Sequence, residues 1–200
     1  MGSMDQLKPV TLEGTHVRLE PLASAHFDDL CNVGLDPELW RWTTSFVETR
    51  DQLRGYIERA IRDGQAGLAL PFATIHRASG RAVGSTRFGA IALQHRRLEI
   101  GWTWLGRAYQ RTALNTEAKY LMLRHAFETL DMLRVEIKTD VLNVRSRAAI
   151  QRIGGKEEGI FRKHIITDQG RIRDTVYYSI TDDDWPAVRE RLEARLAAGA

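Results

Sequence analysis

Hydrophobic and polar residues follow two different periods around the centre of this chain. At 98–105 large apolar residues occupy every second position, which is typical of a strand with two distinct faces. From 113 to 130 apolar residues recur at intervals of about three and four, which indicates a helix with one stripe packed on a sheet. A basic turn at 106–112 joins the two. Because a helix N-terminus presents unpaired backbone N–H groups, and Arg107 and Arg111 add positive charge, this turn is predicted to bind an anion.

The same patterns divide the rest of the chain. Seven strands are predicted in all, at 15–22, 68–76, 82–89, 98–105, 133–140, 156–166 and 172–180. Helices are expected at 113–130 and 144–153, and after candidate caps at Ser24, Thr49 and Thr181. Thr49 and Gln52 have the spacing of a capping box. Helices therefore alternate with a mostly antiparallel sheet.

Composition narrows the class of protein. The chain has 200 residues, enough for one domain, which we place at 4–200, with Met1–Ser3 read as residues added ahead of Met4. It lacks an apolar run long enough to span a membrane and a signal peptide, and its single cysteine, Cys31, offers no internal disulfide. We therefore expect a cytoplasmic protein that does not bind membranes, with Cys31 in the core.

Charge and histidine spacing argue against two further classes of partner. The formal net charge is only +3, and basic and acidic residues are interspersed, so nucleic-acid binding is not expected. The six histidines do not pair at the spacing of metal ligands, so no metal is assigned.

Several phrases, in their joint order, resemble one family. They are Leu98-Glu-Ile-Gly-Trp-Thr-Trp-Leu105, Gln110-Arg-Thr-Ala-Leu-Asn115, Asn115-Thr-Glu-Ala-Lys119, Asn143-Val-Arg-Ser146 and Gly170-Arg-Ile-Arg-Asp174. The chain resembles the Gcn5-related N-acetyltransferases (GNAT), in the branch of the ribosomal-protein N-terminal (alanine/serine) acetyltransferases. The resemblance implies an α/β (α+β) fold: a mixed, mostly antiparallel seven-stranded sheet with a central splay between 98–105 and 133–140, flanked by helices. It also implies acetyl-CoA, or another acyl-CoA, as cosubstrate.

The resemblance further implies where the cofactor lies. The pyrophosphate would bind the amides of the turn at 110–115, and the pantetheine arm would pair with the strand before it; Gly101 favours a bulge there, although an ordinary paired strand stays open. The cofactor-binding candidates are Trp102, Thr103, Trp104, Leu105, Gln110, Arg111, Thr112, Ala113, Leu114, Asn115, Thr116, Asn143 and Ser146. Ala113 and Asn115 replace the small residues of the family turn, Gln/Arg-x-x-Gly-x-Gly/Ala. Since glycine allows a closer approach of phosphate, Ala113 is expected to weaken or shift the cofactor.

Two residues are candidates for catalysis. Glu99 is predicted to accept the proton of the amine, because it precedes the splay and points away from Trp102 and Trp104; the alternative is a structural ion pair with Arg96 or Arg97. The helix at 144–153 lacks the family's frequent tyrosine acid, so Ser146 is the candidate that protonates the thiolate, unless it only bonds backbone as the third helical residue. Asn143 contacts the cofactor or caps this helix.

The sequence thus predicts an N-acetyltransferase that carries acetyl from acetyl-CoA to a primary amine, either a protein N-terminus or a small molecule, by direct attack. The aromatic loop offers Trp40 and Trp42 as substrate-binding residues, with plain packing as the alternative. A non-catalytic acyl-CoA-binding module is the first rival, and a nucleic-acid-binding domain using 144–153 as recognition helix is the second. A homodimer through the aromatic loop or the last hairpin is possible on the family resemblance.

Overall fold

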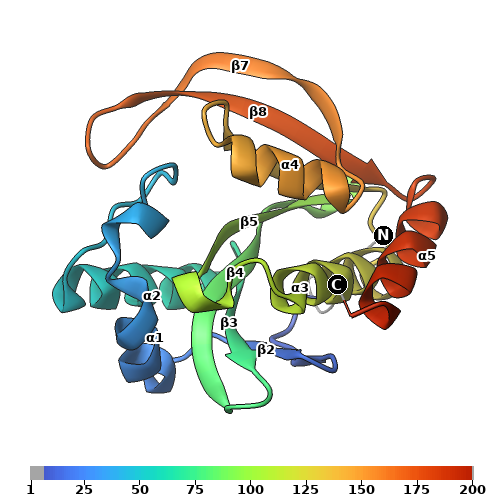
Figure 1. Ribbon diagram of the computed structural model, residues 1–200. Helices are drawn as coiled ribbons and strands as arrows, with labels where there is room; N and C mark the ends of the chain where they lie inside the picture. The colour runs from blue at the N-terminus through green and yellow to red at the C-terminus, as the bar shows by residue number, and fades with distance from the viewer. Residues whose placement is uncertain (1–6, 200) are drawn as a thin grey trace.

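A computed structural model describes residues 7–199, so the reading of Met1–Ser3 falls outside the described residues. Its centre is a sheet with the strand order β1-β2-β3-β4-β5-β6-β8-β7 (Figure 1). The strands are β1 Leu12–Glu13, β2 Val17–Pro21, β3 Leu70–His76, β4 Arg81–Ala92, β5 Arg97–Leu105, β6 Arg134–Asp140, β7 Lys156–Ile166 and β8 Ile172–Thr181. The mixed, mostly antiparallel sheet is confirmed. It has eight strands rather than seven, because β1 is a two-residue strand too short to show an alternation.

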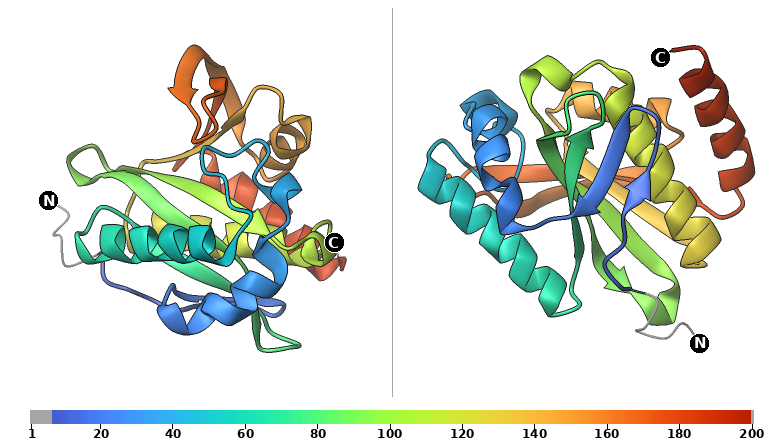
Figure 2. Two further views of the ribbon diagram at one scale, coloured as in Figure 1. Left: turned by 90° about the vertical axis from the view of Figure 1, so that its left-hand side faces the viewer. Right: turned by 90° about the horizontal axis from the view of Figure 1, so that it is seen from below.

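The helices cover the two faces of the sheet. In Figure 1 and in the right-hand view of Figure 2, α1 (Phe27–Gly34) and α2 (Arg50–Gln65) lie on one side, and α3 (Ala113–Arg124) and α5 (Trp185–Ala197) on the other. The helix α4 (Val144–Arg152) contributes Ile150 to the same apolar cluster as α3 and α5. A second cluster, which includes Cys31, lies under α1 and α2, so Cys31 is a buried core residue as predicted. We call the two sides of the sheet the α2 face and the α3 face.

The helix predicted at 113–130 changes geometry part of the way along. Its α-helical part ends at Arg124 and a π-helical turn follows, at His125–Thr129. Leu121 and Phe127 are both buried although they are six positions apart, which is not one of the spacings (three, four or seven) that keep residues on one face of an α-helix. The wider π-helical turn keeps both residues in the core.

Two predicted caps have different outcomes. Thr49 and Gln52 form the capping box at the start of α2. At α5 the N-cap is Asp184 instead of Thr181, and the Asp184 carboxylate accepts a hydrogen bond from the Thr181 hydroxyl at 3.0 Å. Several nearby acids make such an N-terminus hard to place from sequence.

The strands β5 and β6 pair in parallel only at their first residues. The pairs are Arg97 with Arg134, Leu98 with Val135 and Glu99 with Glu136, whereas β5 continues to Leu105 and β6 to Asp140. Beyond Glu99 the two strands therefore separate, which confirms the predicted splay. Backbone groups at this edge of β5 are left for another partner.

A β-bulge in β5 changes which side chains face each helix layer. The β4–β5 register shifts between Ser85 and Arg87, and Trp102 has a φ of 50°, in the left-handed region. Before the bulge Leu98 and Ile100 pack on the α3 face; after it, Trp104 packs in the cluster under α1 and α2. Trp102 also lies on the α2 face, where the Arg87 guanidinium is 5.1 Å from its ring. The bulge that Gly101 favours is therefore present. Glu99 shares the α2 face, so the expectation that it points away from Trp102 and Trp104 is wrong, because the bulge reverses the alternation for the residues that follow it.

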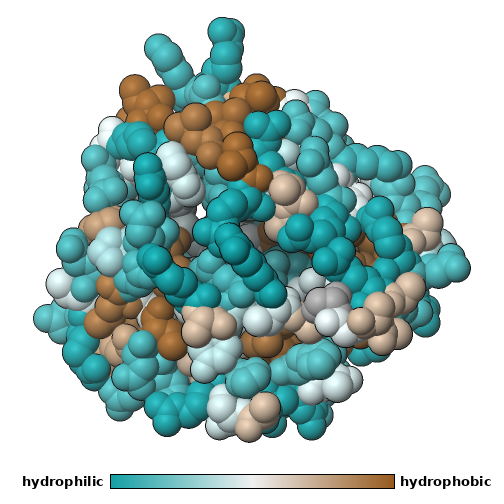
Figure 3. All heavy atoms as spheres, viewed as in Figure 1, coloured by the Kyte–Doolittle hydropathy of each residue, from teal (hydrophilic) through white to brown (hydrophobic). Residues whose placement is uncertain are grey.

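The surface carries a patch of apolar side chains on the last hairpin. Figure 3 shows them gathered at the top of the view, over β7 and β8, and the exposed large residues of these strands are Ile160, Phe161, Ile166 and Ile172. The suggested dimer contact at this hairpin stays a prediction. Within residues 7–199 no helix is both long and apolar enough to cross a membrane.

Candidate active site

The predicted anion-binding turn lies at the start of α3. Thr112 is the N-cap, and its hydroxyl accepts a hydrogen bond from the Leu114 amide at 3.3 Å. The other first-turn amides have no helical partner by geometry, and Arg111 before them adopts a left-handed φ of 62°. The side-chain oxygen of Asn115 is buried without a partner. The free amides at this positive helix end are complementary to a phosphate ligand, whereas the Asn115 oxygen is an acceptor and does not contribute to such a site, so the anion site stays a prediction.

A side-chain bridge connects the turn with α4. Gln110 donates to the Leu105 carbonyl at 3.0 Å and accepts a hydrogen bond from Arg145 at 2.9 Å. The bridge brings the end of β5, the α3 turn and the beginning of α4 together. Arg145 is therefore engaged within the protein, and Arg147 is bonded to Tyr178 and Glu157, which argues against α4 as a recognition helix for nucleic acid.

Asn143 and Ser146 lie at the start of α4, on the β6 side of the splay. The Asn143 side chain accepts a hydrogen bond from the Ser146 amide at 3.1 Å, so Asn143 does cap the helix. The Ser146 amide is thus used structurally. Its half-buried hydroxyl makes no side-chain hydrogen bond within residues 7–199 and is available as a donor.

Glu99 belongs to a charged cluster at the last paired position of the splay. Its carboxylate pairs with Lys138 at 2.9 Å, and Lys138 also contacts Glu136 at 3.2 Å. Burial alone lowers the pKa of Lys138, but the two carboxylates outweigh it and the pKa is raised. The ion pair expected as an alternative, between Glu99 and Arg96 or Arg97, is not formed, because Arg96 pairs with Asp131 and Arg97 pairs with Glu136.

A glycine makes room for the second oxygen of Glu99. A Cβ atom at Gly101 would lie 2.7 Å from Glu99 Oε1, closer than two such atoms can approach. The other oxygen is held by Lys138. Oε1 is thus positioned over a residue without a side chain, next to the bulge.

The two tryptophans of the aromatic loop differ in role. Trp40 is only 2% exposed, packs on Trp104 with ring centroids 5.3 Å apart, and donates from its indole nitrogen to the Gly34 carbonyl. Its assignment to substrate binding is therefore wrong, because it anchors the loop in the core. Trp42 is half-buried beneath the Arg171 guanidinium, 5.4 Å from its ring, and stays a candidate.

Sequence reasoning missed two buried residues of α3. Lys119 is 6% exposed, has no acidic partner among residues 7–199, and donates to Thr103 at 2.6 Å and Thr86 at 3.3 Å. Burial lowers its pKa to about 7. Glu117 accepts hydrogen bonds from the amides of residues 15, 16 and 17 at 2.6–2.7 Å. The two residues are two positions apart on the helix, so they flank its apolar stripe on opposite sides, where the sequence pattern carries little signal of burial.

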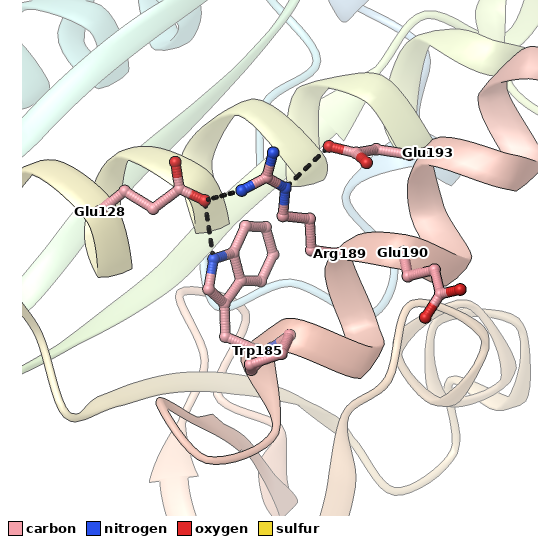
Figure 4. A pocket seen from close by; sticks show the side chains of 6 residues that line it. Glu128, Trp185, Arg189, Glu190 and Glu193 are labelled. Carbon is pink, nitrogen blue, oxygen red and sulfur yellow. Dashed lines mark hydrogen bonds and ion pairs between the residues drawn. The ribbon is translucent and has the colours of Figure 1, made fainter.

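A groove on the α3 face is braced by polar contacts between α5 and the π-helical turn. Figure 4 shows Arg189 between Glu128 and Glu193, and the Trp185 indole donating to Glu128 at 3.0 Å. The donors and acceptors of these side chains are bonded to one another, so we interpret the contacts as structural. Among residues 7–199 no group of three or more His, Cys, Asp or Glu side chains is placed to hold a metal ion.

A splayed mixed sheet with a helix N-terminus at the end of the central strand agrees with the family comparison. The sequence profile of the acetyltransferase (GNAT) domain matches residues 16–156. The chain therefore belongs to the GNAT acetyltransferase family, which uses acyl-CoA.

Individual relatives agree with the assignment of this chain to the GNAT family. A GCN5-related N-acetyltransferase from Brucella melitensis superimposes with a TM-score of 0.88 and 31% identity, over 96% of this chain and 90% of that one. Mycobacterium smegmatis RimJ in complex with CoA-disulfide has the same fold, with a TM-score of 0.77 and 22% identity over 94% and 96% of the chains. The "Putative ribosomal N-acetyltransferase YdaF" of Bacillus subtilis is 36% identical over 91 residues, 46% of this chain and 49% of that protein. The match thus spans about half the length of that relative.

Proposed function

We propose that this protein transfers an acyl group, most simply acetyl, from acyl-CoA to a primary amine by direct attack in a ternary complex. The observation that carries the proposal is the succession of three features along the strand β5 and the turn that follows it. The edge of β5 is unpaired beyond Glu99, free amides lie at the start of α3 where β5 leads, and the Glu99 carboxylate stands at the last paired position.

The cofactor residues proposed are those of the α3 turn and the β5 edge. The turn from Gln110 to Thr116 would hold the pyrophosphate on its amides, with Arg111 adding charge. The backbone of Trp102 to Leu105 would pair with the pantetheine amides, in the place that a β6 neighbour would otherwise take. The RimJ complex shows CoA bound to a protein of this fold, which supports the assignment by analogy.

Glu99 would take the proton released by the amine. The amine nitrogen bonds to the thioester carbon, the carbon–sulfur bond breaks, and one amine proton passes to the Glu99 carboxylate. An amide of the bulge would donate a hydrogen bond to the carbonyl oxygen as charge develops there. The Ser146 hydroxyl, free of side-chain partners in the described part of the chain, would give its proton to the departing thiolate. It would take up a proton from solvent at the same time, while Glu99 returns the amine proton to solvent.

Two classes of acceptor are candidates, a protein N-terminus and a small-molecule amine. The name of the Bacillus subtilis relative suggests a ribosomal protein N-terminus, and a small amine is equally compatible with the charged α2 face.

Free-thiol release from acetyl-CoA with a panel of N-terminal peptides, amino acids, polyamines and aminoglycosides tests the proposal, beside calorimetric titration with CoA. Amine-dependent release establishes the transferase. Binding of CoA with no release across the panel favours the non-catalytic module, and no CoA binding overturns the cofactor site.

Two variants test Glu99 itself. Glu99→Gln should lower kcat by on the order of 100-fold while the Kd for CoA stays unchanged. Gly101→Ala should produce a loss in the same direction with little change in stability, because its Cβ displaces only the flexible end of the Glu99 side chain. Unaltered kcat in both variants would remove Glu99 from the mechanism.

A further inference from the structure

An arginine on the α2 face, Arg173, is buried without a hydrogen-bond partner among the described residues. Along β8, Val176 and Tyr178 belong to the apolar cluster of the α3 face, so the residues alternating with them, Arg173, Thr175 and Tyr177, point to the α2 face. The position of Lys138, 4.6 Å from the Tyr177 ring, agrees with this assignment. Arg173 thus lies on the same face as Glu99.

No hydrogen bond or ion pair within residues 7–199 holds the Arg173 guanidinium. The residue is 7% exposed, and its Nε is buried without a partner in the described part of the chain. Asp140 and Glu99 are near enough to act on it electrostatically. Asp140, however, is bonded to Arg171 at 2.5 Å and to the Leu142 amide at 2.9 Å, and Glu99 is paired with Lys138.

A second orphaned donor lies two residues further along the strand. Thr175 is fully buried, and its hydroxyl has no partner. It is the β8 residue in register with Asp140, on the same face as Arg173. Two unused groups on one face, the buried Nε–H of Arg173 and the buried Thr175 hydroxyl, are complementary to a ligand that brings anionic oxygen atoms.

We propose that Arg173, assisted by Thr175, binds a carboxylate of the acceptor, so that the substrate is an amine that also carries a carboxylate. The inference rests on the proposed acyltransferase and names its substrate class. The amine would lie toward Glu99 and the carboxylate toward Arg173, whose planar fork suits bidentate recognition. The carboxylate has two possible sources, the α-carboxylate of a free amino acid or an acidic side chain near a peptide N-terminus.

The kinetic experiment uses acceptors matched for everything except the carboxylate. One pair is alanine with alaninamide, and the other is the peptide amide Ser-Asp-Ala with Ser-Asn-Ala. We expect kcat/KM to favour the carboxylate member of one pair on the order of 100-fold in the native protein, which identifies the source. Arg173→Met should abolish this preference through KM with the Kd for CoA unchanged, and Arg173→Lys should restore part of it.

Arg162→Met is the matched control, because it removes the same charge from an exposed position of the same hairpin and should keep the preference. Arg173→Met should also unfold at a temperature no lower than the native protein, since it removes an unpaired buried charge. A preference that survives Arg173→Met, a changed Kd for CoA, or a clearly lowered unfolding temperature would each overturn the proposal.

A binding measurement separates this inference from the proposed activity. In the presence of CoA, the Arg173 Nε–H resonance in ¹⁵N NMR should shift on titration with N-acetylalanine or the N-acetylated Ser-Asp-Ala amide, and not with their carboxamide counterparts. A shift without turnover of any amine would keep the carboxylate site and reject the transferase. Turnover without such a shift would keep the transferase and reject the carboxylate site.

Discussion

The two faces of the sheet treat buried charge in opposite ways where β5 leaves β6. On the α3 face the Lys119 ammonium is bonded to two threonine hydroxyls and the Glu117 carboxylate to three backbone amides. On the α2 face Lys138 is paired with two carboxylates, whereas Arg173 has no hydrogen-bond or ion-pair partner in the described part of the chain. A buried charge whose bonding capacity is used fixes the fold, and one whose capacity is unused indicates a ligand.

The largest effect is expected for the carboxylate that ties α3 to the first hairpin. Glu117→Ala orphans three amides near the start of β2, and should lower the free energy of unfolding by about 3–4 kcal/mol. Urea denaturation measures it, and Glu117→Gln, which keeps one carbonyl acceptor, should lose less. A loss below about 1 kcal/mol for alanine would show that these bonds are not structural on the α3 face.

Lys138 sharpens the contrast on the α2 face. Lys138→Met leaves Glu99 and Glu136 without their shared cation, and should lower the free energy of unfolding by about 2–3 kcal/mol at pH 7, whereas Arg173→Met should not lower it. Parallel urea titrations of the two variants compare them directly. Equal losses would erase the distinction between paired and unpaired cations.

The pKa of Lys119 makes stability depend on pH. Burial lowers the pKa to about 7 in the folded protein, so between pH 7 and about pH 10 the unfolded chain holds more protons than the folded one. The contribution of Lys119 should therefore rise by about 2 kcal/mol from pH 7 to pH 9. The difference in unfolding free energy between the native protein and Lys119→Met isolates it, and a difference that is flat with pH would contradict the assignment.

The smallest effect concerns the hydroxyl that receives the Lys119 amine. Thr103→Val keeps the shape of the side chain but removes the acceptor 2.6 Å from Nζ, and should cost about 1 kcal/mol at pH 6. The cost should shrink at pH 9, where the amine is neutral and its hydrogen bond weaker. Chemical denaturation at both pH values provides the test. A larger cost at pH 9 would show that charge is not what Thr103 stabilises.

Local patterns in the sequence predict most of the fold, and the long-range contacts are what they leave out. Alternation and capping motifs placed the main strands and α2 because these depend on neighbouring residues. The splay came from the family resemblance rather than from periodicity. Gly101 favours a bulge, but the position of the bulge at Trp102 depends on the register with β4. The burial of Trp40 depends on contacts with Trp104, which is 64 positions away along the chain.

The same limit applies to the site. The α3 turn could be predicted because a helix N-terminus and its flanking charges are contiguous in sequence. That Glu99 pairs with Lys138, that Gly101 leaves space for it and that Arg173 is unpaired all depend on strands brought together by the topology. A single sequence lists these residues but does not bring them together.

The short pairing between β5 and β6 also has a mechanical consequence. The strands β5 and β6 share three parallel backbone pairs, fewer than β4–β5 or β6–β8, beside the ion pairs Glu99–Lys138 and Arg97–Glu136 and, further along, the Gln110–Arg145 bridge. We therefore expect the sheet to twist most easily about this line. A chain-like ligand that paired along the free edge of β5 would act as a surrogate strand and stiffen the molecule about this axis. Amides on both sides of the line should then exchange with solvent more slowly once the ligand is bound, including those far from any reacting atom.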